Sequence, residues 1–179
     1  MHLIAAALFA FATNAHAAEL DGVTLPDTAT VDGQTLVLNG MGLREKYFID
    51  VYVGGLYLPA KMTDGNKAIQ QDTPKKIVMQ FIYSHVEADK MVETYQEGFE
   101  VNPAAASLQP QIQQFLGWMQ DVKEGDQVVL EYAPGKGTTL TMAGKVKGTI
   151  PGPEFMRLVF SNYIGPNANK ALRTGLLGQ

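Results

Sequence analysis

Cysteine is absent from the 179 residues, and histidine is scarce. Without cysteine the chain forms no disulfide bond and offers no thiolate nucleophile, no cysteine-ligated zinc and no iron–sulfur cluster. Of the three histidines, His2 and His16 lie in an N-terminal segment that we expect to be cleaved, which leaves His85. One histidine does not support a histidine-rich metal site. We therefore predict neither a bound metal nor a cofactor.

Positive charge is also low, because 14 Lys and Arg stand against 18 Asp and Glu, for a net charge of −4. A protein that binds nucleic acid normally presents a basic face, so nucleic acid is not an expected partner. With 46% hydrophobic and 18% charged residues, the composition differs from that of a disordered chain or a coiled coil. At this length it is typical of one globular domain.

The N-terminal segment has a different composition from the rest. Residues 3–12 are a run of ten apolar residues, about half the length that a stable membrane span needs. The small-residue pattern Ala15-His16-Ala17 follows, which is typical of a signal-peptide cleavage site. We therefore expect a signal peptide at 1–17 and a mature, periplasmic domain at 18–179. No Lys or Arg precedes the apolar run, and the alternative is an N-terminal apolar strand or anchor.

Turn residues alternate with β-branched and aromatic runs through much of the remaining chain. These patterns predict strands at 23–25, 36–38, 47–58, 75–82, 126–132, 138–143 and 145–150. Apolar residues spaced three and four apart predict helices at 65–71, 87–101 and 108–119, one that starts at 153, and one at 167–177. Antiparallel strands with a layer of helices make an α+β domain.

Three polar features have ordinary structural explanations. The Gly-Lys of residues 134–139 lacks the spacer of a phosphate-binding loop and precedes a strand, so a hairpin turn is favoured. The acidic residues of the 87–101 helix are expected on its solvated face. His85 has no evident partner that would orient it as a base, and a capping or surface role is favoured.

Arg44 is more informative, because it lies in the apolar and aromatic segment 36–58. A guanidinium group keeps its charge, so a buried one needs an anion or several carbonyl groups. One interpretation pairs it with Asp50, or exposes it near a turn at Glu45-Lys46. The other places it at the floor of an apolar cavity, where it binds the carboxylate of a ligand.

Four short motifs recur in order along the chain: Gly42-Leu43-Arg44, the segment 53–58, the segment 163–166, and Leu172 with Gly175-Leu176-Leu177. With these motifs the chain resembles the chalcone isomerase-like family, especially its exported bacterial branch. The resemblance extends over nearly all of the mature chain. It implies an open-faced β-sandwich, in which helices cover a large antiparallel sheet and the ligand cleft lies between them.

The same resemblance bears on catalysis. The plant enzyme closes a ring in chalcones with an Arg and a Thr on strands and a Tyr and an Asn on the following helix. Arg44 matches that Arg, whereas Tyr52 falls at the Thr, Met91 at the Tyr and Gly98 at the Asn. Methionine neither donates a proton nor orients a water, so the resemblance implies no catalytic residues here. Non-catalytic members of the family are similar to fatty-acid carriers that hold the carboxylate with an Arg and a Tyr.

Together these observations predict an exported, non-catalytic binding protein for a hydrophobic carboxylate such as a fatty acid. Arg44 would pair with the carboxylate and Tyr52 would donate a hydrogen bond, while Met91 would line the acyl cavity. Tyr95 and Phe99 would line it too, or pack in the core. One alternative is a chalcone isomerase-like intramolecular lyase, and another is a structural envelope protein whose cleft is filled by its own side chains. The oligomeric state is left open.

Overall fold

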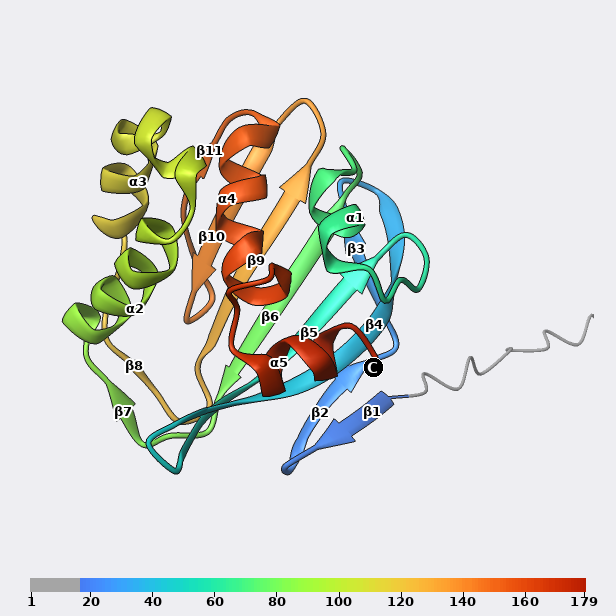
Figure 1. Cartoon of the computed structure of the whole chain (residues 1–179). Coiled ribbons are helices and arrows are strands. Elements are labelled where there is room, and N and C mark those ends of the chain that lie inside the picture. The colour runs from blue at the N-terminus through green and yellow to red at the C-terminus, as the bar shows by residue number, and fades with distance from the viewer. Residues whose placement is uncertain (1–16) are drawn as a thin grey trace, which may run out of the picture.

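A seven-stranded, fully antiparallel sheet organises the protein (Figure 1). The computed structural model describes residues 17–179, and the predicted signal peptide lies outside the described residues except for Ala17. The strand order across the sheet is β11-β10-β9-β6-β5-β4-β3. The strands are β3 (Thr28–Val31), β4 (Gln34–Lys46), β5 (Ile49–Leu58), β6 (Lys75–Phe81), β9 (Gln127–Ala133), β10 (Gly137–Met142) and β11 (Lys145–Ile150).

Helices pack against one face of this sheet (Figure 1). They are α1 (Gly65–Gln70), α2 (Ala88–Glu100), α3 (Gln109–Leu116), α4 (Pro153–Ile164) and α5 (Lys170–Leu176), with a 3₁₀ turn at Pro103–Ser107. Helix α2 shows why they pack there: Met91, Tyr95 and Phe99 recur every four residues and are all buried. A second pair of strands, β7 (His85–Val86) and β8 (Val122–Lys123), lies beside the start of α2.

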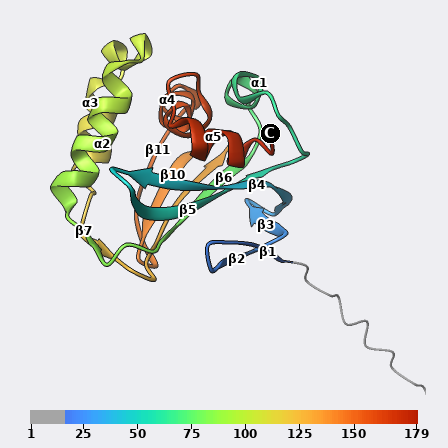
Figure 2. The ribbon, with the colours of Figure 1, turned by 60° about the horizontal axis from the view of Figure 1, so that its bottom comes forward.

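Within residues 17–179, the opposite face of the sheet is covered only by the hairpin of β1 (Ala17–Leu20) and β2 (Val23–Pro26), as Figure 2 shows. A smaller apolar cluster lies under this hairpin and includes Leu25, Val53 and Tyr57. The Tyr57 hydroxyl donates a hydrogen bond to the Pro26 carbonyl oxygen at 2.9 Å, which fixes the hairpin to the sheet. One face covered by helices and the other left largely open confirm the predicted open-faced β-sandwich.

Most of the expected boundaries agree with the structure to within a few residues. Strand β4, which we predicted at 36–38, extends to Lys46, and β1, β3, β7 and β8 were not predicted. The other difference lies at the β4–β5 hairpin. Tyr47 and Phe48, which we predicted as the start of a strand, instead form its turn, with φ of 53° and 66°. Tight hairpin turns usually carry Asn, Asp or Gly at such positions. The prediction failed here because aromatic residues favour strands and gave no local signal of a turn.

Helix α5 lies directly on β4, because two glycines of the strand have no side chain to hold it away. A Cβ atom at Gly40 or Gly42 would collide with backbone carbonyl oxygens of α5. The buried Asn39 side chain adds hydrogen bonds on the same side. This contact determines the position of β4 just before Arg44. At the Gly54-Gly55 pair of β5 the close neighbours are side chains instead, because leucines of α5 pack on Gly54 and Leu25 of β2 packs on Gly55.

Candidate ligand-binding site

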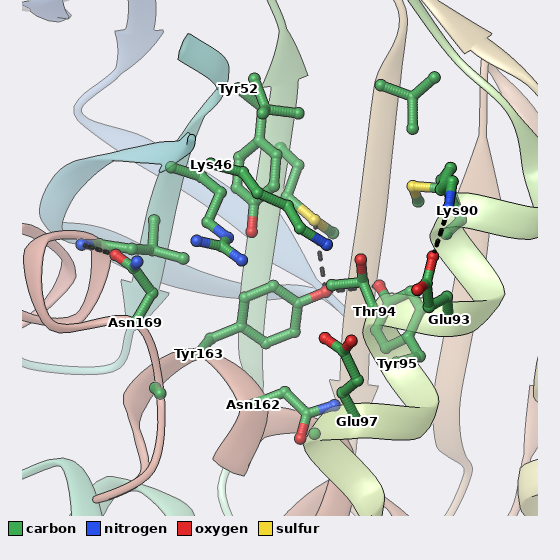
Figure 3. Close-up of a pocket in the computed structure, with 18 of the residues that line it drawn as sticks. Lys46, Tyr52, Lys90, Glu93, Thr94, Tyr95, Glu97, Asn162, Tyr163 and Asn169 are labelled. Atoms are coloured by element: carbon green, nitrogen blue, oxygen red, sulfur yellow. Dashed lines mark hydrogen bonds and ion pairs between the residues drawn. The ribbon is translucent and has the colours of Figure 1, made fainter. Parts of the chain in front are cut away.

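A cavity of about 1090 Å³ lies between the sheet and the helices, slightly larger than most small-molecule sites. Its walls come from the β4–β5 hairpin, β6, α2, the C-terminal end of α4 and the start of α5. Apolar side chains line it beside a group of phenol, amide and charged groups. Figure 3 shows the phenol groups of Tyr52 and Tyr163 directed toward the same region, with Lys46 close by.

Arg44 and Tyr52 are direct neighbours across β4 and β5, and both line the cavity. The half-buried Arg44 side chain donates a hydrogen bond from Nη1 to the Glu45 carbonyl oxygen at 2.7 Å. Among residues 17–179, no ion pair includes Arg44, so the predicted alternative of a bridge to Asp50 is absent from them. Strand register shifts after Arg44 and pairs Asp50 with Glu45 instead. Arg44 therefore keeps its positive charge without an acidic partner in this part of the chain.

The Tyr52 phenol is suited to donate a hydrogen bond at neutral pH. Its ring packs against Phe81, with ring centroids 5.4 Å apart. Burial raises the pKa of Tyr52 well above its ordinary value, the neighbouring Tyr95 adds to the rise, and Arg44 opposes it. The hydroxyl therefore stays protonated in the physiological range.

A second pair of phenols lies deeper in the cavity. The hydroxyl oxygens of Tyr95 and Tyr163 are 2.5 Å apart, and the Tyr163 hydroxyl also contacts the sulfur atom of Met79 at 3.3 Å. Burial raises the pKa of Tyr95 to about 12, although its hydrogen bond with Tyr163 lowers it. Burial, Tyr95 and Tyr52 together raise the pKa of Tyr163 well above its ordinary value. The sequence analysis included Tyr163 in a family motif but did not identify it as a cavity residue.

The predicted apolar wall on α2 divides between cavity and core. Met91 and Tyr95 line the cavity and are also buried in the main apolar cluster. Tyr95 packs edge-on against Phe115, with ring centroids 4.8 Å apart. Phe99 is buried in the core and is not a lining residue. The core-packing alternative therefore describes Phe99, whereas Tyr95 has both roles.

Helix α4 supplies an amide group that the sequence did not predict. The Asn162 carboxamide lies against Gly98, where a Cβ atom would approach its Cγ to 2.7 Å. Gly98 is the position at which the family resemblance places an asparagine of the plant enzyme. Because Gly98 lacks a side chain, the Asn162 amide of α4 occupies the space beside it; Figure 3 shows Asn162 among the residues that line the cavity. No local pattern indicates this, since residues 98 and 162 belong to different elements.

Charged side chains surround the mouth of the cavity. Glu93 and Glu97 are exposed, as predicted, but they also lie at the cavity rim, and Glu93 pairs with Lys90 at 2.8 Å. His85 is exposed at the rim and its Nε2 lies 3.5 Å from Asp121 Oδ2, a partner the sequence did not reveal. Among residues 17–179, no group of three or more His, Cys, Asp or Glu side chains is placed to hold a metal ion.

Comparisons with known proteins agree with this architecture. A family model described as chalcone isomerase-like matches residues 17–178. The fold is similar to the crystal structure of a fatty-acid binding protein of Arabidopsis thaliana, with a TM-score of 0.72 and 18% sequence identity over 90% of this chain and 96% of that one. No curated protein matches the sequence. None of the described helices has the length and apolar character to cross a membrane.

Proposed function

The chain belongs to the chalcone isomerase-like family, and from that premise we propose that it is an exported, non-catalytic binding protein for a hydrophobic carboxylate such as a fatty acid. Arg44 carries the proposal, because its guanidinium group lines the cavity and has no acidic partner among residues 17–179. The similar Arabidopsis structure, described as a fatty-acid binding protein, supports the same class of ligand.

The polar end of the ligand would lie between Arg44 and Tyr52. A guanidinium group offers two parallel N–H donors to a carboxylate, which makes it the side chain best suited to this group. Tyr52 lies directly across from it and stays protonated, so it donates a further hydrogen bond to the same oxygen atoms. The bound anion would also supply the negative charge that Arg44 lacks among the described side chains.

The apolar end of the ligand would contact side chains from both layers. Val51 and Phe81 come from the sheet, while Met91 and Leu172 come from the helices. Methionine is flexible and adapts to acyl chains of different shape. A cavity with one cationic end and apolar walls thus matches an amphiphilic anion better than a neutral or fully polar solute.

Calorimetric titration of the wild-type protein with dodecanoate and with 1-dodecanol tests this assignment. We expect dodecanoate to bind, and Arg44→Gln to weaken its binding by at least about tenfold, because a partly buried charge pair is lost. The same substitution should leave the binding of 1-dodecanol unchanged. Lys145→Gln removes an equal charge from an exposed site outside the cavity and should change neither affinity.

Two results would contradict the proposal. If wild-type protein binds neither compound, the cavity does not take acyl chains of this class. If Arg44→Gln binds dodecanoate as tightly as wild type does, the carboxylate does not lie at Arg44.

Export is the second part of the proposal and is supported by the apolar run and the Ala15-His16-Ala17 pattern. Expression of the full chain in a Gram-negative host should yield a periplasmic product that begins at Ala18. Its intact mass identifies the cleavage site. An uncleaved product in the cytoplasm would refute export while leaving the binding assignment intact.

The Tyr95–Tyr163 pair favours a second candidate, an intramolecular lyase that acts on chalcones. Two hydrogen-bonded phenols in a cavity that also holds Arg44 and Tyr52 provide proton donors beside a fixed positive charge. Chalcone absorbance followed with purified protein tests it. Turnover that disappears in Arg44→Gln would establish the enzyme, and no turnover above the uncatalysed rate would exclude it.

A further inference from the structure

The turn of the β4–β5 hairpin exposes three consecutive hydrophobic side chains. Tyr47 is 84% exposed, Phe48 is 97% exposed and Ile49 is 42% exposed. We call residues 47–49 the hairpin tip. Figures 1 and 2 both show it projecting beyond the end of the sheet, on the side of β7 and the start of α2.

The backbone conformation of the hairpin tip is one that aromatic residues rarely adopt. Tyr47 and Phe48 both adopt positive φ, of 53° and 66°, a region that favours Gly, Asn and Asp. Phe48 also has almost no contact with the rest of the protein, since nearly all of its side chain is exposed. Neither turn geometry nor packing of the fold therefore explains an aromatic residue at this position.

The hairpin tip also borders the ligand cavity. Lys46, Tyr47 and Ile49 line its mouth, and Glu87 and Lys90 lie among the lining residues supplied by the start of α2. Tyr83, another exposed aromatic residue at 38%, lines the same opening. A surface that contacts the hairpin tip would therefore lie next to the entrance.

We propose that the hairpin tip inserts into the interfacial zone of a lipid bilayer and brings the cavity mouth to the membrane surface. The hairpin tip is a single turn and is too small for a stable protein interface, which buries about 800 Å² on each partner. Tyrosine and other amphipathic aromatic residues concentrate at the level of lipid headgroups. The Lys46 ammonium group lies 5.9 Å from the centre of the Tyr47 ring, directly behind the hairpin tip, where it would reach lipid phosphates.

The charges beside the hairpin tip determine the type of membrane. Glu45 and Asp50 face each other across the strands behind it and offset Lys46, and the whole chain has a net charge of −4. Attraction to an anionic surface is therefore not the source of binding. Insertion of apolar side chains should instead support binding to zwitterionic lipid and make it insensitive to salt.

Flotation of the ligand-free protein with phosphatidylcholine vesicles tests the proposal. We expect wild-type protein to float with the vesicles equally at low and high salt. Phe48→Gly suits the positive φ of this position and should reduce the bound fraction at least about fivefold, because it removes the most exposed apolar group. Phe48→Trp should bind at least as well as wild type, and its fluorescence should shift to shorter wavelength when vesicles are added. Val146→Ser, at an exposed valine on β11, is the matched control and should bind as wild type does.

Several outcomes would overturn the proposal. Wild-type protein that does not float, or Phe48→Gly that floats equally well, would exclude insertion of the hairpin tip. Sedimentation that reveals a concentration-dependent dimer lost in Phe48→Gly would assign the hairpin tip to a second copy of the chain.

If the hairpin tip inserts into a bilayer, a hydrophobic carboxylate could pass directly between the bilayer and the cavity. This consequence rests on the proposed function. The two proposals fail separately, because flotation needs no fatty acid. Arg44→Gln should lose dodecanoate binding yet float as wild type does, whereas Phe48→Gly should retain dodecanoate binding in solution. If Arg44→Gln no longer floats, membrane binding depends on more than the hairpin tip, which contradicts the proposal.

Discussion

Replacing Asn39 by Asp exchanges one NH₂ group for an oxygen atom at the centre of the contact between β4 and α5. Strand register skips Asn39, because Leu38 pairs with Tyr57 and Gly40 pairs with Leu56. The buried side chain donates from Nδ2 to the Met62 carbonyl oxygen at 2.9 Å and to the Leu176 carbonyl oxygen at 2.7 Å. Its Oδ1 accepts from the Met62 N–H at 2.6 Å.

Two variants separate the loss of these hydrogen bonds from the introduction of charge. Asn39→Ala leaves one buried and two partly buried backbone groups without partners and should lower the free energy of unfolding by about 3 kcal/mol, at roughly 1 kcal/mol each. Asn39→Asp keeps the bond from the Met62 N–H but faces two carbonyl oxygens with a buried carboxylate. Its loss at pH 7 should be larger, about 3–5 kcal/mol. Either loss is a large fraction of ordinary domain stability.

The pH dependence of Asn39→Asp follows from the same geometry. Two facing carbonyl groups and burial favour the protonated acid, so the folded state holds the pKa of the new carboxyl group above its unfolded value. The folded state then binds more protons than the unfolded state between those two pKa values. The stability of the variant should therefore fall as pH rises through that window, and should approach that of Asn39→Ala or better at low pH.

Urea unfolding followed by far-ultraviolet circular dichroism, at pH 7.5 and pH 5, measures these differences. Wild type and Asn39→Ala serve as references for acid effects elsewhere in the protein. An Asn39→Asp variant within about 0.5 kcal/mol of wild type at pH 7.5 would refute the argument, because such a value is ordinary for surface substitutions. A difference from Asn39→Ala that does not change with pH would also refute it.

Two further predictions concern glycine packing and a buried lysine. Gly42→Ala should lower the melting temperature in calorimetry by several degrees, because its Cβ would collide with an α5 backbone carbonyl. In Gly54→Ala the new Cβ meets a movable leucine side chain at 3.1 Å, so the melting temperature should fall less. Equal decreases in the two variants would contradict this reasoning. Burial lowers the pKa of Lys75 to about 8, so between pH 8 and 9, below the range in which the unfolded tyrosines titrate, the unfolded chain binds a proton that the folded protein lacks, and the free energy of unfolding should rise with pH. Lys75→Met should abolish that rise, and a rise that persists in the variant would assign it to other groups.

Sequence reasoning was most successful where the signal is local. The 134–139 segment was assigned to a hairpin from its glycines and the strand that follows, and it joins β9 to β10. Met91, Tyr95 and Phe99 were placed on one face of a helix from their spacing, and all three are buried. Such patterns depend only on backbone periodicity and turn chemistry within a few residues.

The candidate site was only partly accessible to the same reasoning. Arg44 and Tyr52 were brought together by a family resemblance, and the strand register makes them direct neighbours. Tyr163 and Asn162 of α4 were missed as cavity residues. They contact Tyr95 and Gly98 of α2, respectively, and the two helices are far apart in the sequence. Contacts between distant elements have no periodic signal along the chain.

Local sequence patterns identified the helices and most strands of the large sheet in their order, because apolar spacing and turn residues act over one or two turns of backbone. The sequence also determined that a permanent cation lies within an apolar segment. Which faces meet follows from the tertiary structure: the pairing of β4 with β5 places Tyr52, rather than Asp50, directly opposite Arg44, and a turn at Tyr47-Phe48 exposes aromatic side chains beside the cavity. The physical reason is that one residue of shift in a strand exchanges its two faces, and packing of the whole sheet, rather than any local preference, selects the shift.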